Sequence, residues 1–169
     1  MNIETERLMI RGFMPEDAEA LQEILGDAET MEFSEPPYSL EDTKEFLSGF
    51  CIEREGGAAI VLRETGKLIG YILFNELEDS VYELGCFFNR SFWRRGYAFE
   101  ACSAVIGYAF EKLNAHKVFT ETADAEKTVG LIEKLGMRLE GVQREQTLDN
   151  HGNRLDMYLY GILRSELQA

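Results

Sequence analysis

The first third of the chain passes from alternating apolar positions to helical spacing. Ile3, Leu8 and Ile10 lie among polar residues, which predicts a strand over residues 3–13. Pro15 suits the first turn of a helix, and Gly26 marks where that helix ends. The predicted apolar face of this helix consists of Leu21, Ile24 and Leu25.

A second helix is predicted after the break "SEPPYS" at residues 34–39. Ser39 and Asp42 have the form of a capping box, in which each side chain bonds the backbone N–H of the other residue. The apolar face of this helix is expected to carry Phe46, Leu47, Phe50 and Cys51.

The middle of the chain reads as three successive strands. Residues 59–76 form two β-rich runs around a turn at 64–67, and "VYELGCFF" at 81–88 follows. Gly85 lies inside that third strand. Because a glycine weakens a strand, its position predicts either a bulge or the close approach of another backbone or a ligand.

The second half begins with a helix from Tyr97 and continues with a strand at 117–122 and a short helix at 126–136. Two runs, 137–148 and 154–163, then predict a closing hairpin. The apolar positions of the first of these helices recur at three- and four-residue spacing: Cys102, Val105, Ile106, Ala109, Phe110 and Leu113.

This order of elements predicts one mixed α/β domain over residues 1–169, with helices around a central, mainly antiparallel sheet. The 169 residues are 45% hydrophobic and 28% charged, which is typical of a globular protein. No apolar run is long enough to cross a bilayer, and the N-terminus has no secretory pattern. A cytoplasmic protein without a membrane partner is therefore expected.

Charge and the reactive side chains narrow the function further. A formal net charge of −14 disfavours nucleic-acid binding and favours cationic substrates such as amines. The three cysteines form no CxxC pair, and the two histidines lack metal-ligand spacing, so no metal site is predicted. The sequence also lacks a GxxxxGK[ST] loop, a GxGxxG after a strand and a GxSxG elbow.

The stretch "FWRRGYAFEA" at residues 92–101 clusters two arginines and a glycine directly before a helix. The first turn of a helix presents unbonded N–H groups and a partial positive charge, and Gly96 lets an anion approach the backbone. Arg90, Arg94 and Arg95 add charge that can pair with phosphate oxygens. The alternative is that these arginines only balance acidic neighbours on a solvated surface.

The segment "YELGCFFNRSFWRRGYAFEA" resembles the coenzyme A-binding motif of the GNAT superfamily of N-acetyltransferases. It is most similar to the branch that contains the ribosomal-protein alanine acetyltransferases. The resemblance extends to "ETERLMIRGFMPEDAEAL", "LIEKLGMRLEGVQRE" and "GNRLDMYLYGIL", in the order of that branch.

The resemblance implies a binding site for acetyl-coenzyme A. Cys86 and Phe88 would pair through their backbones with the pantetheine arm, and Gly85 would mark a bulge beside the thioester. The coenzyme A pyrophosphate would receive hydrogen bonds from the backbone N–H groups of Arg94, Arg95, Gly96, Tyr97 and Ala98.

Four positions depart from the pattern of the superfamily. Trp93 replaces the more usual Gln or Arg, a change that the branch tolerates. Ala125 stands where an asparagine usually contacts the cofactor, and Thr128 stands where a serine is usual. Ile132 occupies the position of the tyrosine that many members use as an acid toward the thiolate.

The resemblance implies that a carboxylate on the bulged strand, directly or through water, takes the amine proton. Glu83, two residues before Gly85 and on the same face of the strand, is the candidate for this general base. The alternative is that it balances an arginine or binds a cationic acceptor. Thr128 is the candidate donor of a proton to the thiolate, and the alternative is a helix N-terminal threonine that bonds the backbone.

The sequence thus predicts an acetyl-coenzyme A-dependent N-acetyltransferase, monomeric or homodimeric, that acts on a primary amine. The acceptor is either a protein N-terminus or a small amine. Glu32, Glu35 and Tyr38 are candidates to line the amine site, with a solvated loop as the alternative. A non-catalytic module that binds or senses acyl-coenzyme A is the competing hypothesis.

Overall fold

The computed structural model of the chain describes residues 1–124 and 126–167. Its centre is an eight-stranded sheet in the order β1-β2-β3-β4-β5-β6-β8-β7. The strands are β1 (Asn2–Glu4), β2 (Leu8–Gly12), β3 (Gly57–Leu62), β4 (Leu68–Glu78), β5 (Val81–Phe88), β6 (Lys117–Thr122), β7 (Arg138–Leu148) and β8 (Arg154–Leu163). The helices are α1 (Ala18–Leu25), α2 (Leu40–Phe46), α3 (Tyr97–Glu111) and α4 (Val129–Lys134).

Neighbouring strands run antiparallel except for β5 and β6, so the predicted fold class is confirmed. The capping box that begins α2 is also confirmed: the Ser39 hydroxyl accepts a hydrogen bond from the Asp42 N–H, and Asp42 accepts one from the Ser39 N–H. After α2 the chain continues as a π-helical segment, Leu47–Glu53, which carries the predicted apolar face onward.

Two of the predicted elements have the wrong bounds. The single strand expected at 3–13 is two strands, because Thr5 closes a tight turn: its N–H donates to the Leu8 carbonyl, and its hydroxyl accepts from the Leu8 N–H at 2.9 Å. The helix expected at 126–136 is shorter and begins at Val129, because a turn held by Asp124 occupies the residues before it.

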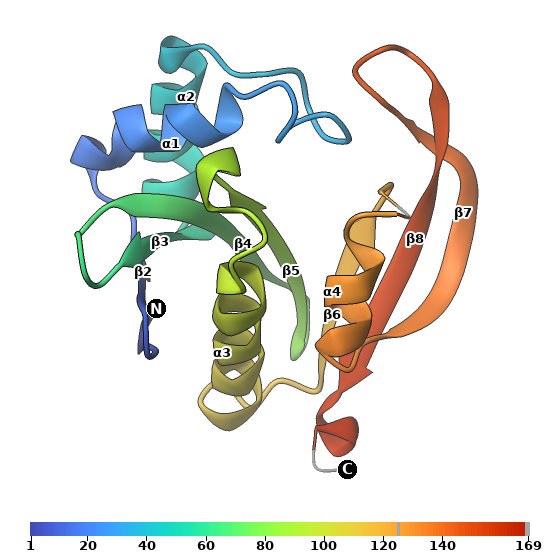
Figure 1. Ribbon diagram of the computed structural model, residues 1–169. Helices are drawn as coiled ribbons and strands as arrows, with labels where there is room; N and C mark the ends of the chain where they lie inside the picture. Colours follow the sequence, from blue (N-terminus) through green and yellow to red (C-terminus); the bar gives the residue numbers. More distant parts are fainter. Residues whose placement is uncertain (125, 168–169) are drawn as a thin grey trace.

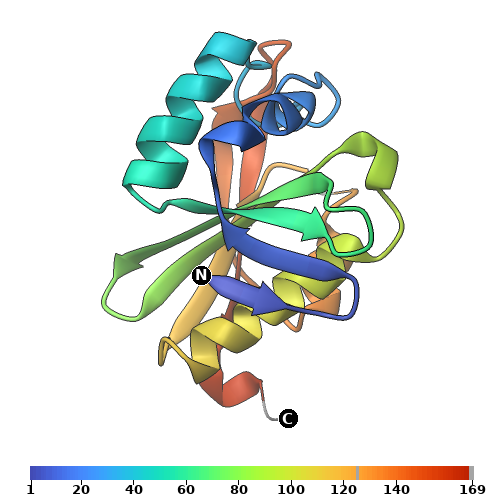
Figure 2. The ribbon, with the colours of Figure 1, turned by 90° about the vertical axis from the view of Figure 1, so that its left-hand side faces the viewer.

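Helices cover both faces of the sheet. Figure 2 shows α1 and α2 on one face and α3 on the other. Alternation along the strands supplies an apolar side chain to each layer. The layer under α3 is built on Leu8, Ile10, Ile60, Leu84, Val105 and Phe110, and the layer under α1 and α2 on Leu21, Ile24, Leu47, Val61 and Tyr71.

The parallel pair β5–β6 is short. Only Val81, Tyr82 and Glu83 pair with residues 117–119, and beyond Glu83 the two strands diverge (Figure 1). The edge of β5 from Leu84 to Phe88 is therefore unpaired on the β6 side, while its other edge stays bonded to β4.

The bulge expected at Gly85 is absent. Gly85 keeps regular register with Leu73 of β4, and the irregularity between these strands lies at Glu76 and Glu78. The glycine instead allows close packing: a Cβ placed there would lie 3.3 Å from the Leu73 Cβ. Gly85 lies in the part of β5 that has lost its β6 neighbour.

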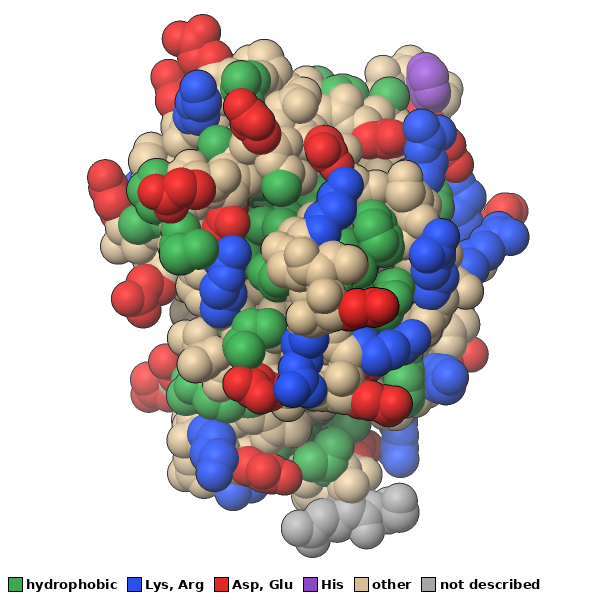
Figure 3. Space-filling model, turned by 60° about the vertical axis from the view of Figure 1, so that its left-hand side comes forward, with side chains coloured by type: hydrophobic (Ala, Val, Ile, Leu, Met, Phe, Trp, Pro, Cys, Tyr) green, Lys and Arg blue, Asp and Glu red, His purple; other side chains and the backbone are tan. Residues whose placement is uncertain are grey.

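Surface charge is unevenly distributed in this acidic chain. On the face in Figure 3, Lys and Arg side chains gather toward the right-hand side, and Asp and Glu side chains predominate on the left. No helix in the described ranges combines the length and the apolar character that crossing a membrane requires.

Candidate functional site

The turn before α3 has an unusual backbone. Gly96 precedes the helix with φ of +81°, and Arg94 also has a positive φ, +59°. A side chain disfavours this left-handed conformation, which costs a residue such as Arg94 about 1–2 kcal/mol. Alternation of left-handed and ordinary residues turns successive N–H groups toward one point, which is the geometry of an anion-binding nest.

The N–H groups of this turn have no acceptor. Within the described residues, no hydrogen bond is donated by the N–H groups of Arg94, Arg95, Gly96, Tyr97 and Ala98. The Glu100 N–H bonds the Gly96 carbonyl at 3.1 Å, in the first turn of α3. The helix dipole adds partial positive charge at the same point. All five predicted amides are therefore open to an anion.

Arg7 supports the turn from the start of the chain. Its Nη1 donates to the Arg95 carbonyl at 3.0 Å, and its Nε donates to Glu100 in the first turn of α3 at 2.6 Å. The guanidinium also lies over the Tyr97 ring, 4.4 Å from the centroid. Although burial opposes it, hydrogen bonds from Thr5 and Arg7 lower the pKa of Glu100.

Of the three arginines expected to pair with phosphate, two form no ion pair with a described carboxylate, whereas the third balances acidic neighbours. Arg90 pairs with Asp27 and Glu29, whereas neither Arg94 nor Arg95 forms an ion pair with a described residue. Arg95 lies over the Phe92 ring at 5.5 Å. The two guanidinium groups thus remain available beside the open amides.

The end of β5 lies next to this turn. Cys86 and Phe88 direct their side chains into the α3 core. The Asn89 N–H bonds β4, so the alternating backbones of Phe88 and Cys86 face the edge that β6 leaves unpaired. The Trp93 indole N–H donates to the Phe88 carbonyl at 2.8 Å. Trp93, the departure noted in the sequence, therefore ties the turn to the strand, and the Phe88 carbonyl keeps one further lone pair.

Glu83 is the last residue of β5 that pairs with β6. It lies on the face of the sheet that α1 and α2 cover, half-buried, and no described residue forms an ion pair with it. Burial raises the pKa of Glu83, and the negative charge of Glu121 on β6 raises it further. A carboxylate with a raised pKa and no cationic partner suits proton transfer.

Thr128 lies at the start of α4, and its hydroxyl bonds the local turn. The hydroxyl donates to the Asp124 carbonyl at 2.6 Å and lies 2.9 Å from the Thr122 hydroxyl. Ile132 is buried in the core. Ala125, at the position of the missing asparagine, lies outside the described residues.

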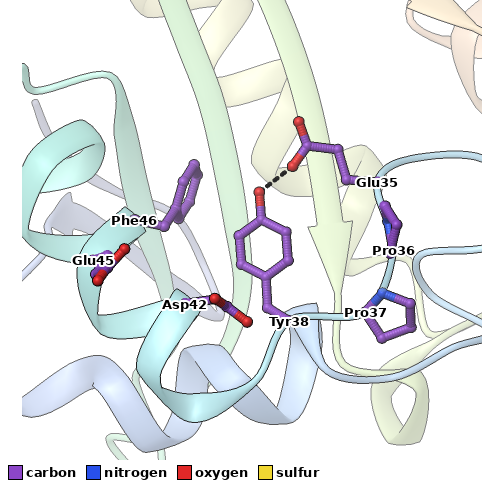
Figure 4. A pocket seen from close by; sticks show the side chains of 7 residues that line it. All are labelled: Glu35, Pro36, Pro37, Tyr38, Asp42, Glu45 and Phe46. Carbon is purple, nitrogen blue, oxygen red and sulfur yellow. Dashed lines mark hydrogen bonds between the residues drawn. The ribbon is translucent and has the colours of Figure 1, made fainter.

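Aromatic rings and carboxylates meet on the Glu83 face, beneath the loop between α1 and α2. The Tyr38 hydroxyl donates to Glu35, and the Tyr38 ring meets Phe46 edge-on at 5.7 Å (Figure 4). Phe46 in turn meets Tyr71 of β4 at 5.7 Å. Glu32, the other acidic candidate of this loop, pairs with Lys127.

The sheet is mainly antiparallel, its one parallel pair of strands separates early, and open amides lie at the helix that follows β5. Together these features indicate an acetyltransferase of the GNAT class. The chain belongs to the GNAT family: residues 7–138 match the model described as "Acetyltransferase (GNAT) domain". It is an N-acetyltransferase, as the resemblance predicted.

The chain is 32% identical to the uncharacterised N-acetyltransferase YnaD of Bacillus subtilis, over 98% of this chain and 99% of the relative. A GNAT-family acetyltransferase from Bacillus anthracis has the same fold with a TM-score of 0.91 and 30% identity, over 98% and 100% of the two chains. Spermidine N-acetyltransferase from Vibrio cholerae, solved with CoA and spermine, shares the fold at a TM-score of 0.84 and 23% identity, with 98% and 100% covered. Ribosomal-protein acetyltransferases also share the fold, at 16–18% identity.

Two residues of the site were not predicted. Arg7 lies inside the quoted segment "ETERLMIRGF", but nothing in a strand-like pattern indicates that its side chain reaches α3. Tyr71 reads as an ordinary apolar position of β4, and only the fold brings it beneath Glu35 and Tyr38.

Proposed function

We propose that the protein transfers the acetyl group of acetyl-coenzyme A directly to a primary amine. The observation that carries this proposal is the set of open amides from Arg94 to Ala98, which adjoins the unpaired edge of β5. The five N–H groups and the dipole of α3 fit the pyrophosphate, and Arg94 and Arg95 add two cations. The backbones of Cys86 and Phe88 hold the pantetheine arm in the place of a neighbouring strand.

Acetyl-coenzyme A supplies a thioester, whose carbonyl carbon the amine attacks while the C–S bond breaks. Glu83 takes the proton that the attacking amine must lose. Burial and the charge of Glu121 raise the pKa of Glu83, which makes its carboxylate a stronger base than that of a solvated glutamate. The thiolate that leaves receives a proton, for which Thr128 is the candidate donor; Thr128 must then turn its hydroxyl away from the Asp124 carbonyl.

The acceptor is a small amine or a protein N-terminus. It approaches on the face of Glu83, which α1 and α2 cover, while the open amides lie at the start of α3 on the other face. The two reactants therefore meet at the sheet itself. Holding them in line provides much of the rate without a further catalytic group.

Two measurements test the proposal. Saturating acetyl-coenzyme A is expected to raise the melting temperature by several degrees, because a ligand that binds only the folded state stabilises it. A panel of amines and Ala-initiated peptides, read by release of free thiol, should then identify turnover above hydrolysis. Binding of acetyl-coenzyme A without transfer to any acceptor would support the non-catalytic module instead.

Glu83→Gln separates acetyl-coenzyme A binding from proton transfer at this site. The variant should bind acetyl-coenzyme A like the wild type and should lose roughly 10²-fold or more in turnover, the usual contribution of a general base. Glu111→Gln, which removes an exposed carboxylate at the end of α3, is the matched control. Unchanged turnover in Glu83→Gln would remove Glu83 from the mechanism.

A further inference from the structure

The hydroxyl of Tyr71 is a polar group without a partner in a buried residue. Tyr71 is 3% exposed, and its ring stacks on Phe87 at 5.7 Å and meets Phe46 edge-on. Gly57 makes room for the ring, because a Cβ there would lie 2.3 Å from it. Within the described residues the hydroxyl forms no hydrogen bond.

This hydroxyl is not fully enclosed by the core. Among the described residues, Thr30 Oγ1 is the one fully enclosed side-chain oxygen or nitrogen that lacks a partner. The Tyr71 hydroxyl also lacks one, so it must reach an accessible space. Burial raises the pKa of Tyr71, and the nearby Cys51, Tyr38, Glu83 and Glu35 raise it further, so the phenol stays protonated.

Tyr71 adjoins a surface hollow of about 450 Å³ at the start of α2, because its ring meets Phe46, which lines that hollow. Its lining consists of residues 35–38 together with Asp42, Glu45 and Phe46 (Figure 4). Three of these residues are acidic and none is basic. Glu35 and Glu45 form no ion pair with a described residue, so their charges are not neutralised by the protein.

The chemistry of the hollow suits a cation. Its carboxylates attract a cation, and the Tyr38 and Phe46 side chains in its lining supply apolar surface for a methylene chain. The Glu35 carboxylate accepts from the Tyr38 hydroxyl, which fixes one wall. Burial and Glu35 together raise the pKa of Tyr38 to about 12, so this hydroxyl remains a donor at neutral pH.

We propose that the acceptor is a small diamine, with one amino group beside Glu83 and Tyr71 and its second, charged amino group in the hollow with Glu35 and Glu45. The inference rests on the proposed function. The Tyr71 hydroxyl accepts a hydrogen bond from the reacting amino group, and the aromatic rings contact the methylene chain. A peptide N-terminus fits this site less well. It carries a polar amide at the position of the methylene chain, and it has no second ammonium group to meet the carboxylates.

The test compares 1,4-diaminobutane with n-butylamine, which has the same chain and lacks the second charge. The wild type is expected to favour the diamine by about ten-fold or more in kcat/KM, the size of one partly exposed charge contact. In Glu35→Gln/Glu45→Gln this preference should disappear, because KM for the diamine rises about ten-fold more than KM for n-butylamine.

Glu41→Gln is the matched control, because Glu41 is exposed on α2 and does not line the hollow. Tyr71→Phe should lower kcat/KM for both amines alike, because the reacting amino group of each donates a hydrogen bond to the Tyr71 hydroxyl. Equal use of the two amines by the wild type would overturn the inference. An equal loss for both amines in the double variant would overturn it as well.

Binding separates this inference from the proposed function. With the protein saturated by coenzyme A, 1,4-diaminobutane should raise the melting temperature of the wild type and of Glu41→Gln but not that of Glu35→Gln/Glu45→Gln. That result supports the diamine site even if no acceptor is acetylated. Turnover of an Ala-initiated peptide, with no diamine binding, would overturn the inference and leave the proposed function standing.

Discussion

The Arg7 guanidinium bonds both the Glu100 carboxylate in the first turn of α3 and the Arg95 carbonyl in the turn before it. One side chain from the start of the chain therefore fixes the relative positions of the open amides and the helix that orients them. Because the Arg95 carbonyl points toward Arg7, the Gly96 N–H, which lies in the same trans peptide plane, points away from that contact.

Arg7→Ala is expected to weaken acetyl-coenzyme A binding by roughly ten-fold, since a hydrogen-bonded charged group at a half-exposed site contributes about 1–2 kcal/mol. Calorimetric titration measures this. Arg63→Ala is the control, because Arg63 bonds the carbonyls of Thr5 and Glu6 but not the turn. Equal losses in the two variants would contradict a specific role for Arg7.

Gly96→Ala is expected to reduce the stabilisation that acetyl-coenzyme A gives. Alanine strains a backbone with φ of +81°, at a cost of about 1 kcal/mol or more, and relief of that strain turns the amides of the nest. Gly66, with φ of +72° and open space around it, lies in the β3–β4 turn. Gly66→Ala should lose similar stability while keeping the full ligand-induced rise in melting temperature.

The raised pKa of Glu83 predicts how stability depends on pH. The folded state binds a proton at Glu83 more tightly than the unfolded chain, so the free energy of unfolding falls as pH rises from about 4, the usual value for glutamate, through the raised pKa. Glu83→Gln removes this loss. In urea unfolding, the free energy of unfolding of Glu83→Gln relative to the wild type should therefore be higher at pH 7 than at pH 4. A difference that does not change with pH would contradict the assignment.

Glu121 offers a second test of the same carboxylate. Its negative charge contributes to the raised pKa of Glu83, after burial. Glu121→Gln should shift the acid limb of the pH–kcat profile to lower pH, because Glu83 then ionises more easily. Glu111→Gln should leave the limb in place. A shift to higher pH in Glu121→Gln would show that another group controls the limb.

Most elements followed from local signals in the sequence. The capping pair Ser39–Asp42 began a helix, and the three- and four-residue spacing after Tyr97 predicted α3. These features depend on neighbours a few residues apart, which the sequence displays.

The errors arose where distant segments decide the structure. Gly85 resembled a bulge, but the regular register with Leu73 reflects packing between two strands. Arg7 contacts residues nearly ninety positions away, and Tyr71 gains its surroundings from β5 and from the loop between α1 and α2. Periodicity carries no information on such contacts, so these residues emerged only from the fold.

The early end of the β5–β6 pairing has a kinetic consequence. The open amides and Glu83 lie toward opposite faces of the sheet. We therefore predict that acetyl-coenzyme A and the amine occupy the enzyme together and that no acetylated side chain carries the group between them. Plots of reciprocal initial rate against reciprocal acetyl-coenzyme A concentration, at several amine concentrations, should intersect; parallel lines would indicate a covalent relay through the protein.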